Sequence, residues 1–124
     1  MKLLTHNFLT SRCIKGVTVG YPLQIIVNEV KDLEVDFNSE FVARMIPKVE
    51  WPALRQAAEN VGKLQDLPET VPEDYDVNEE FLKKAHHVML EVEVVNGELV
   101  CPETGRKFPI TDGIPNMLVN EDEV

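Results

Sequence analysis

The segment CPETGRKFPITDGIPNML, residues 101–118, contains two patterns that bear directly on the architecture of the chain. Its first five residues have the spacing of a Cys-x-x-Cys-Gly turn that supplies two thiolates to a metal, but Thr104 takes the place of the second cysteine. The remainder predicts a hairpin, because KFPI and IPNMLV flank TDG, and Gly113 can supply the left-handed position of a tight turn. The stretch therefore predicts a knuckle followed by two paired strands, and it leaves open whether the knuckle binds a metal.

The segments just before this stretch predict a second hairpin and a helix. In EVEVVNGELVC, residues 91–101, apolar residues alternate on either side of Asn96-Gly97, a pair that can take the two positive φ angles of a type I′ turn. In NEEFLKKAHHVMLE, residues 78–91, Asn78 is a candidate N-cap and apolar residues recur at helical spacing. The spacing of apolar residues thus changes from a period of 3.6 residues to a period of 2 residues where these segments meet. This change predicts a helix followed by a strand.

The middle of the chain predicts a helix followed by a loop. In EWPALRQAAENVG, residues 50–62, Pro52 fits a first helical turn and Gly62 the position just past a helix end. The single tryptophan, Trp51, lies at the start of this helix, and we expect it in the core because an apolar face follows. Residues 63–77 combine two prolines with several acidic residues, which predicts an exposed acidic loop.

The first third of the chain predicts strands and then a short helix. The segments YPLQIIVNEV, residues 21–30, and DLEVDF, residues 32–37, are rich in the β-branched and aliphatic residues typical of strands. In NSEFVARMI, residues 38–46, either Asn38 or Ser39 can cap a helix. Strands at both ends of the chain therefore enclose a helical middle.

This order of elements predicts an α+β fold: a small antiparallel sheet built from both chain ends, with a central helical insertion of about three helices. The length of 124 residues favours a single domain, residues 1–124. Within it we expect a sheet lobe from residues 1–36 and 91–124, and a helical lobe from residues 37–90. The closing NEDEV, residues 120–124, is expected to be a frayed acidic tail.

The composition excludes several functional classes. With 44% hydrophobic and 27% charged residues, and no run near the roughly 18 apolar residues of a membrane span, a soluble globular protein is expected. The start of the chain lacks the apolar region and cleavage site of a signal peptide, so we expect an intracellular protein. Two cysteines are too few for a disulfide framework.

The charge balance argues against direct binding of nucleic acid. Twelve basic residues against 22 acidic ones give a formal net charge of −10, and no basic cluster exceeds two adjacent residues. Phosphate binding needs clustered lysine and arginine side chains. If this protein serves RNA chemistry, a partner must supply the positive surface.

Three segments together carry a resemblance to a known family: MKLLTHNFL (1–9), FVARMIPKVEWPAL (41–54) and GRKFPITDGIPNML (105–118). They resemble, in the same order, the multifunctional methyltransferase subunit, a small zinc-ribbon-like activator of tRNA, ribosomal RNA and translation release factor methyltransferases. The resemblance covers nearly the whole chain and implies a zinc-ribbon-like sheet and a location in the cytoplasm and nucleus. It also implies that this chain has no cofactor of its own, whereas S-adenosylmethionine binds the partner, which agrees with the lack of a G-x-G-x-x-G loop.

The resemblance sharpens the question of the knuckle. Fungal-type members look as if they hold zinc with four cysteines, which map onto Ser11, Gly16, Cys101 and Thr104. Only Cys101 remains as a ligand, and adding Cys13 and His6 does not make a set of four, as a structural zinc site requires. We therefore expect no metal here, with packing by Phe108 and Ile110 in its place.

The resemblance further implies a noncatalytic subunit that forms heterodimers with methyltransferases and meets RNA only through them. Because Pro115 cannot donate to a ladder, IPNMLV predicts an edge strand that a partner sheet can extend. Its aliphatic side chains exceed what one buried face needs, and the THNF segment offers polar groups and an aromatic anchor. The expected partner interface comprises Thr5, Asn7, Phe8, Ile114, Pro115, Asn116, Met117, Leu118 and Val119.

Two other functions stay open at this point. One is a free-standing zinc-ribbon-like module that binds RNA or protein. The other is a small hydrolase or redox enzyme with Cys101 as nucleophile and His86 or His87 as base, which would require these side chains to meet in space. The two histidines are neighbours and lie about 100° apart around a helix, so they do not chelate a metal together.

Overall fold

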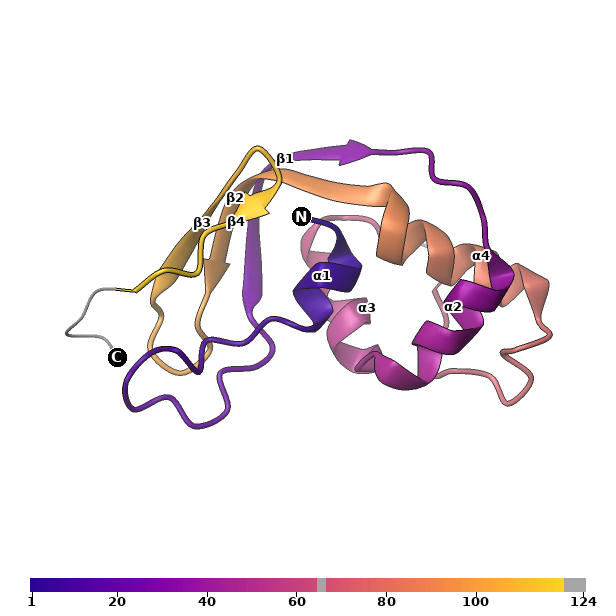
Figure 1. Cartoon of the computed structure of the whole chain (residues 1–124), viewed down its shortest axis with the longest axis horizontal. Coiled ribbons are helices and arrows are strands. Elements are labelled where there is room, and N and C mark those ends of the chain that lie inside the picture. The colour runs from indigo at the N-terminus through magenta and orange to yellow at the C-terminus, as the bar shows by residue number, and fades with distance from the viewer. Residues whose placement is uncertain (65–66, 120–124) are drawn as a thin grey trace.

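A computed structural model describes residues 1–64 and 67–119 of the chain. The expected acidic tail, residues 120–124, lies outside the described residues. Figure 1 shows the sheet at one end of the molecule and the helices at the other, with the long strands β1 and β2 reaching from one to the other. The first residues of the chain lie between these two parts.

In the part of the chain that the structure describes, the sheet is antiparallel and has four strands in the order β1-β2-β3-β4. The strands are β1 (Gln24–Asp32), β2 (Val92–Val100), β3 (Lys107–Thr111) and β4 (Ile114–Pro115). β1 precedes the helices in the sequence and β2 to β4 follow them. The predicted α+β class, with an antiparallel sheet from both chain ends, is therefore confirmed.

The predicted hairpin turn at Asn96-Gly97 is wrong, because both residues lie inside the uninterrupted strand β2. Gly97 pairs with Val27 on one side and Ile110 on the other. A Cβ atom built on Gly97 would come closer than 3.0 Å to the carbonyl oxygen of Ile26. Gly97 therefore does not form a turn. It permits a close approach of two backbones, which is a common reason for a glycine inside a strand.

Irregular pairing between β1 and β2 explains why the sequence around Asn96-Gly97 has the pattern of a hairpin turn. The register between β1 and β2 shifts between Val27 and Glu29 and again between Glu29 and Val30. The buried positions of β2 change phase accordingly, from Val92 and Val94 to Gly97 and Leu99. A bulge interrupts the alternation of buried and exposed residues as a turn does, so the two cannot be told apart by periodicity.

The expected strand 32–37 is also wrong beyond its first residue, because β1 ends at Asp32. Its neighbour β2 begins at Val92 and is preceded by a helix, so within residues 1–64 and 67–119 no strand pairs with the residues after Asp32. The backbone N–H of Leu33 instead donates to the carbonyl oxygen of Glu91, and that of Val35 to the Glu91 carboxylate at 3.0 Å. The segment is thus attached to the end of a helix.

The helical middle agrees with the sequence. Its elements are α2 (Ser39–Met45), the 3₁₀ turn η1 (Ile46–Lys48), α3 (Trp51–Asn60), α4 (Glu79–His86) and the π-helical turn η2 (His87–Glu91). Asn38 and Asn78 cap α2 and α4 by accepting from the N–H groups of Phe41 and Phe81, each at 3.1 Å. Gly62 follows α3 with a φ of +73°.

The segment between α3 and α4 contains no helix or strand among its described residues, in agreement with the expected acidic loop. Trp51 is 7% exposed, its indole N–H donates to Pro68 of this loop at 3.0 Å, and its ring packs on Phe81. The expected core role of Trp51 is therefore confirmed. Among the described residues, no helix combines the length and the apolar character needed to cross a bilayer.

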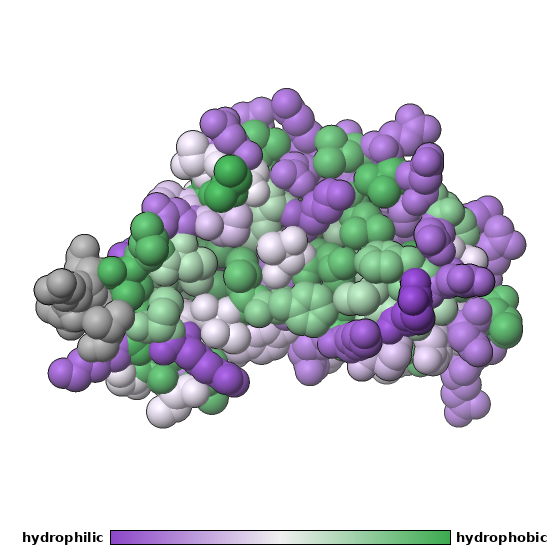
Figure 2. All heavy atoms as spheres, in the orientation of Figure 1, coloured by the Kyte–Doolittle hydropathy of each residue, from purple (hydrophilic) through white to green (hydrophobic). Residues whose placement is uncertain are grey.

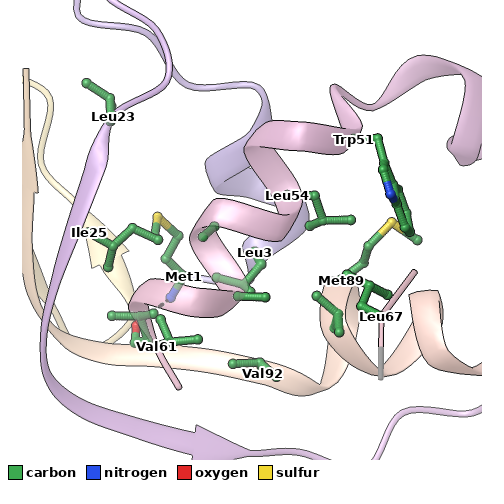
Figure 3. Close-up of a cluster of buried hydrophobic side chains, with 14 of the residues drawn as sticks. Met1, Leu3, Leu23, Ile25, Trp51, Leu54, Val61, Leu67, Met89 and Val92 are labelled. Atoms are coloured by element: carbon green, nitrogen blue, oxygen red, sulfur yellow. Dashed lines mark hydrogen bonds between the residues drawn. The ribbon is translucent and has the colours of Figure 1, made fainter. Parts of the chain in front are cut away.

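A short helix that the sequence did not predict, α1 (Leu3–Asn7), joins the two parts of the molecule. It contacts α3, η2 and β2, and a single hydrophobic cluster extends from the sheet to the helices. Figure 3 shows Met1 and Leu3 between Ile25 of β1 and Leu54 of α3. The proposed division into sheet and helical lobes stays a prediction, because this cluster is shared by both.

The α-amino group of Met1 fixes the start of the chain to the sheet. It donates to the carbonyl oxygens of Val94 and Gly113 at 2.8 and 2.6 Å and forms an ion pair with Glu93 at 3.0 Å. Gly113 belongs to the turn between β3 and β4. The contact therefore links the beginning of the chain to the last hairpin.

The burial of His6 in α1 leads us to expect that the protein loses stability on acidification. The side chain is 1% exposed, its Nε2 lies 2.7 Å from the carbonyl oxygen of Leu23, and its buried Nδ1 has no hydrogen-bond partner among the described residues. Burial lowers the pKa of His6 below the ordinary 6.5, although the bond to Leu23 opposes this. The unfolded chain then binds more protons than the folded one between the lowered pKa and 6.5, so stability falls as the pH drops below about 6.5.

We expect the melting temperature to fall between pH 7 and pH 5, and to fall less in His6→Gln, which keeps a donor for Leu23 but does not titrate. Thermal melts of both proteins across this range test the expectation. An equal loss in both proteins would assign the acid sensitivity to other groups.

Candidate partner interface

The β3–β4 hairpin forms one edge of the sheet. Its two-residue turn, Asp112-Gly113, has positive φ angles of 50° and 78°, which confirms the expected left-handed glycine. Thr111 pairs with Ile114 across the turn, and Ile110 with Pro115. Because Pro115 carries no N–H group, its place on an edge strand agrees with the chemistry of proline.

The regular strand is much shorter than the predicted IPNMLV, since β4 ends at Pro115. The N–H of Asn116 still reaches the carbonyl oxygen of Pro109 at 2.9 Å. The N–H of Leu118, however, donates to the side chain of Asn116 at 3.0 Å. An Asn side chain that binds the backbone two residues on produces a turn, which accounts for the end of the strand.

Apolar side chains of this edge face solvent. Ile114 is 69% exposed and Leu118 80% exposed, whereas Met117 and Val119 are partly buried against the core. Figure 2 shows apolar side chains at the end of the molecule that carries β3, β4 and the C-terminus in Figure 1. This edge also contains an open hollow of about 690 Å³ lined by Pro109, Thr111, Asp112, Ile114, Pro115, Asn116, Met117 and Leu118. The expected set therefore divides into exposed side chains and side chains that also support the fold.

The opposite edge of the sheet, β1, is less suited to pairing with another strand. It carries the two register shifts described above, and Glu29, Lys31 and Asp32 are exposed along it. Bulges and charged side chains are common means of preventing edge-to-edge association. The edge at β4 is therefore the better candidate for strand addition.

The amino-terminal part of the expected interface is only partly exposed. Thr5 is exposed and Phe8 is 51% exposed, as a partner contact requires. Asn7 is 3% exposed, donates to the carbonyl oxygen of Glu50 at 3.0 Å and accepts from the N–H of Glu50 at 2.9 Å. Its expected position at an open rim is therefore wrong, because its side chain holds the chain that leads into α3.

The knuckle brings together only some of the four residues at the positions where the resemblance implies zinc ligands. The Ser11 hydroxyl donates to the Cys101 sulfur at 3.0 Å, and the backbone N–H of Thr104 approaches the same sulfur at 3.4 Å. Gly16 offers no donor atom on a side chain. Among the described residues no three His, Cys, Asp or Glu side chains are grouped to hold a metal ion. One thiol with hydroxyl and glycine neighbours does not fit the tetrahedral Cys or His set of a structural zinc site.

The thiol of Cys101 is buried and hydrogen-bonded within the knuckle, as is typical of a structural cysteine. It is 2% exposed, and burial raises its pKa, but hydrogen bonds from Ser11, Thr104 and the backbone of Glu103 outweigh burial and leave the pKa below 9.0. Neither histidine of the proposed enzyme is among these partners. In the described part of the chain, the hydrogen bonds of the Cys101 thiol therefore do not involve His86 or His87.

The two histidines instead belong to a cluster at the end of α4. His86 is 4% exposed and its Nε2 lies 2.8 Å from the carbonyl oxygen of Val35, while Nδ1 of His87 lies 3.0 Å from Glu91. The backbone N–H of Val35 lowers the pKa of Glu91, and His87 adds to this effect. These contacts attach the segment after β1 to the helices.

Sequence reasoning missed Glu103, whose carboxylate binds backbone groups of the loop that faces the knuckle. Its carboxylate accepts hydrogen bonds from the backbone N–H groups of Thr18, Val19 and Gly20. The N–H groups of Gly20, Thr18 and Val19 hold the pKa of Glu103 below its ordinary value. An exposed glutamate in a turn gives no sequence signal for such a role, because its partners lie more than 80 residues away.

Comparison with known proteins places this arrangement in one family. The family model described as Trm112p-like protein matches residues 2–113. A mouse relative, the multifunctional methyltransferase subunit TRM112-like protein, is 56% identical over 124 residues, covering 99% of this chain and 98% of its own. The multifunctional methyltransferase subunit TRM112 homolog A of Arabidopsis thaliana is 52% identical with full coverage of both chains.

A solved structure supports the same fold. It is that of the E. cuniculi Mtq2-Trm112 complex, described as responsible for the methylation of the eRF1 translation termination factor. The match has a TM-score of 0.62 at 18% identity and covers 95% of each chain. The resemblance inferred from the three sequence segments is thus confirmed along the chain, and the protein belongs to the Trm112p-like family.

Proposed function

We propose that this chain is a noncatalytic subunit that binds and stabilises S-adenosylmethionine-dependent methyltransferases through its β4 edge. The observation that carries the proposal is a pair of highly exposed aliphatic side chains, Ile114 in the edge strand β4 and Leu118 in the turn that follows it. Family relatives named as methyltransferase subunits, and a complex of a Trm112 chain with a methyltransferase, support the choice of partner.

The physical mechanism is the mutual protection of two apolar surfaces. A methyltransferase with an open sheet edge or apolar patch tends to aggregate, and a partner that pairs with the edge and buries the patch removes this tendency. Binding also stabilises by mass action: at 100 times the dissociation constant the gain is about 2.7 kcal/mol. In this proposal the subunit has no step in methyl transfer, and S-adenosylmethionine binds the catalytic partner.

The proposed substrates follow from the partners. We propose methylation of tRNA, ribosomal RNA and translation release factor, with consequences for ribosome biogenesis, and a location in the cytoplasm and nucleus. The net charge of −10 supports contact with RNA through the partner, because an acidic subunit repels phosphates.

Co-expression tests the proposal directly. The tagged chain is produced with the Mtq2-type methyltransferase of the same organism, and soluble yield, co-purification and methyl transfer to release factor are measured. We expect the enzyme to be soluble and active only with the chain, and the chain alone to show no calorimetric binding of S-adenosylmethionine. An enzyme that is soluble and fully active alone and does not co-purify would contradict the proposal.

A further inference from the structure

One carboxylate connects two loops that are far apart in the sequence. Glu103, in the turn after β2, accepts from the N–H and the hydroxyl of Thr18, each at 3.2 Å. It also accepts from the N–H groups of Val19 and Gly20, at 2.9 and 2.6 Å. Successive backbone N–H groups that converge in this way form an anion-binding nest. Here the anion belongs to the protein itself.

These two loops carry the four positions at which the sequence resemblance implies zinc ligands. Ser11 and Gly16 lie in the first loop, and Cys101 and Thr104 lie in the second. Their donor atoms do not fit zinc, as described above. We propose that the Glu103 carboxylate, bound in the nest of Thr18, Val19 and Gly20, holds the two loops together in place of a metal ion. This inference concerns the free chain and does not depend on the proposed function.

The surroundings of Gly20 are adapted to this contact. Its carbonyl oxygen accepts from the backbone N–H of Ser11 at 2.9 Å while its own N–H binds Glu103. A Cβ atom on Gly20 would lie 2.6 Å from the Ser11 hydroxyl oxygen, and its φ of +58° disfavours other residues. Ser11 in turn donates to Cys101. The carboxylate nest and the hydroxyl–thiol bond thus form two adjacent links between the loops.

The linked loops also touch the proposed partner edge. The guanidinium group of Arg106, at the end of the second loop, donates to the carbonyl oxygens of Lys107 and Leu118. The thiol of Cys13, in the first loop, lies 3.8 Å from the carbonyl oxygen of Met117. The two loops therefore contact the segment that presents Leu118.

Amide hydrogen exchange of the free, full chain tests the proposal residue by residue. In Glu103→Ala we expect the amides of Thr18, Val19 and Gly20 to exchange at least about tenfold faster, since an amide without its acceptor opens more readily. In Glu103→Gln the single carbonyl oxygen can still serve Val19 and Gly20, so the amide of Thr18 should lose most protection. Glu73→Ala, which removes an equal charge from the exposed acidic loop, should change none of the three.

A second experiment tests whether a bound metal ion contributes to the link between the loops. Dialysis of the wild-type chain against EDTA should leave its melting temperature and the three protected amides unchanged. Two results would overturn the proposal: a folded Glu103→Gln chain with all three amides protected as in wild type, or an EDTA-treated wild-type chain that releases stoichiometric zinc and loses the protection.

Discussion

Leu118→Asp is expected to abolish co-purification with a methyltransferase without unfolding the free chain. Leu118 is 80% exposed, so a carboxylate at this position stays in water as long as the chain is alone. In the proposed complex the same position is covered by the partner, and an unpaired carboxylate buried there costs several kcal/mol. Since each 1.4 kcal/mol is about a tenfold change in affinity, the loss should exceed roughly a hundredfold.

A matched control separates this effect from that of an added charge. Val77 is 78% exposed and lies just before α4, on the helical side of the molecule. Val77→Asp therefore adds the same charge at an aliphatic side chain of equal exposure, away from the proposed interface. We expect the Val77→Asp chain to co-purify as the wild type does.

The neighbouring positions refine the experiment. Ile114→Asp should behave as Leu118→Asp does, because Ile114 is also exposed and lies in β4 itself. Met117→Asp is a weaker test, since Met117 packs partly against the core and its loss mixes folding with binding. Circular dichroism melts of each variant establish that the chain is folded. Wild-type capture by both folded variants would move the interface to another surface.

The fold could be predicted where local chemistry determines the structure. Asn38 and Asn78 cap helices, Gly62 follows one, and Gly113 forms a hairpin turn, each because a single residue satisfies a local requirement. The sequence was misleading where a partner strand determines the structure. The phase of β2 and the end of β1 depend on which residues face them across the sheet, and periodicity does not contain that information.

The candidate site shows the same division. The edge position of Pro115 follows from its missing N–H group and could be predicted. The burial of Asn7 could not, because it depends on Glu50 more than 40 residues away. The role of the exposed Glu103 could not be predicted either. Its partners are backbone N–H groups, which almost every residue has, so the residue types in the sequence do not reveal the nest. The role of Glu103 becomes visible only when the two loops meet.

Gly97→Ala provides the strongest test of the pairing between β1 and β2. Gly97 has no positive φ, and in such a place the change from glycine to alanine ordinarily stabilises a protein by about 0.4–1 kcal/mol, through the unfolded chain. Here the added Cβ atom would meet the backbone carbonyl oxygen of Ile26 closer than 3.0 Å, and a backbone atom cannot move aside as a flexible side chain can. The ladder between the strands must therefore open or shift.

We expect Gly97→Ala to lower the free energy of unfolding by on the order of 3 kcal/mol, at the upper end of the cost of overpacking. For a chain of this length that corresponds to a fall of roughly 10 °C in the melting temperature. Gly105→Ala serves as the control, because its surroundings are open and only its φ of +77° opposes the change, at about 1–2 kcal/mol. Urea and thermal unfolding of the two variants give the comparison. A Gly97→Ala chain as stable as wild type, or more so, would show that the two strands are not this close. Strand β2 would then have a more open arrangement around Asn96 and Gly97 than the continuous ladder.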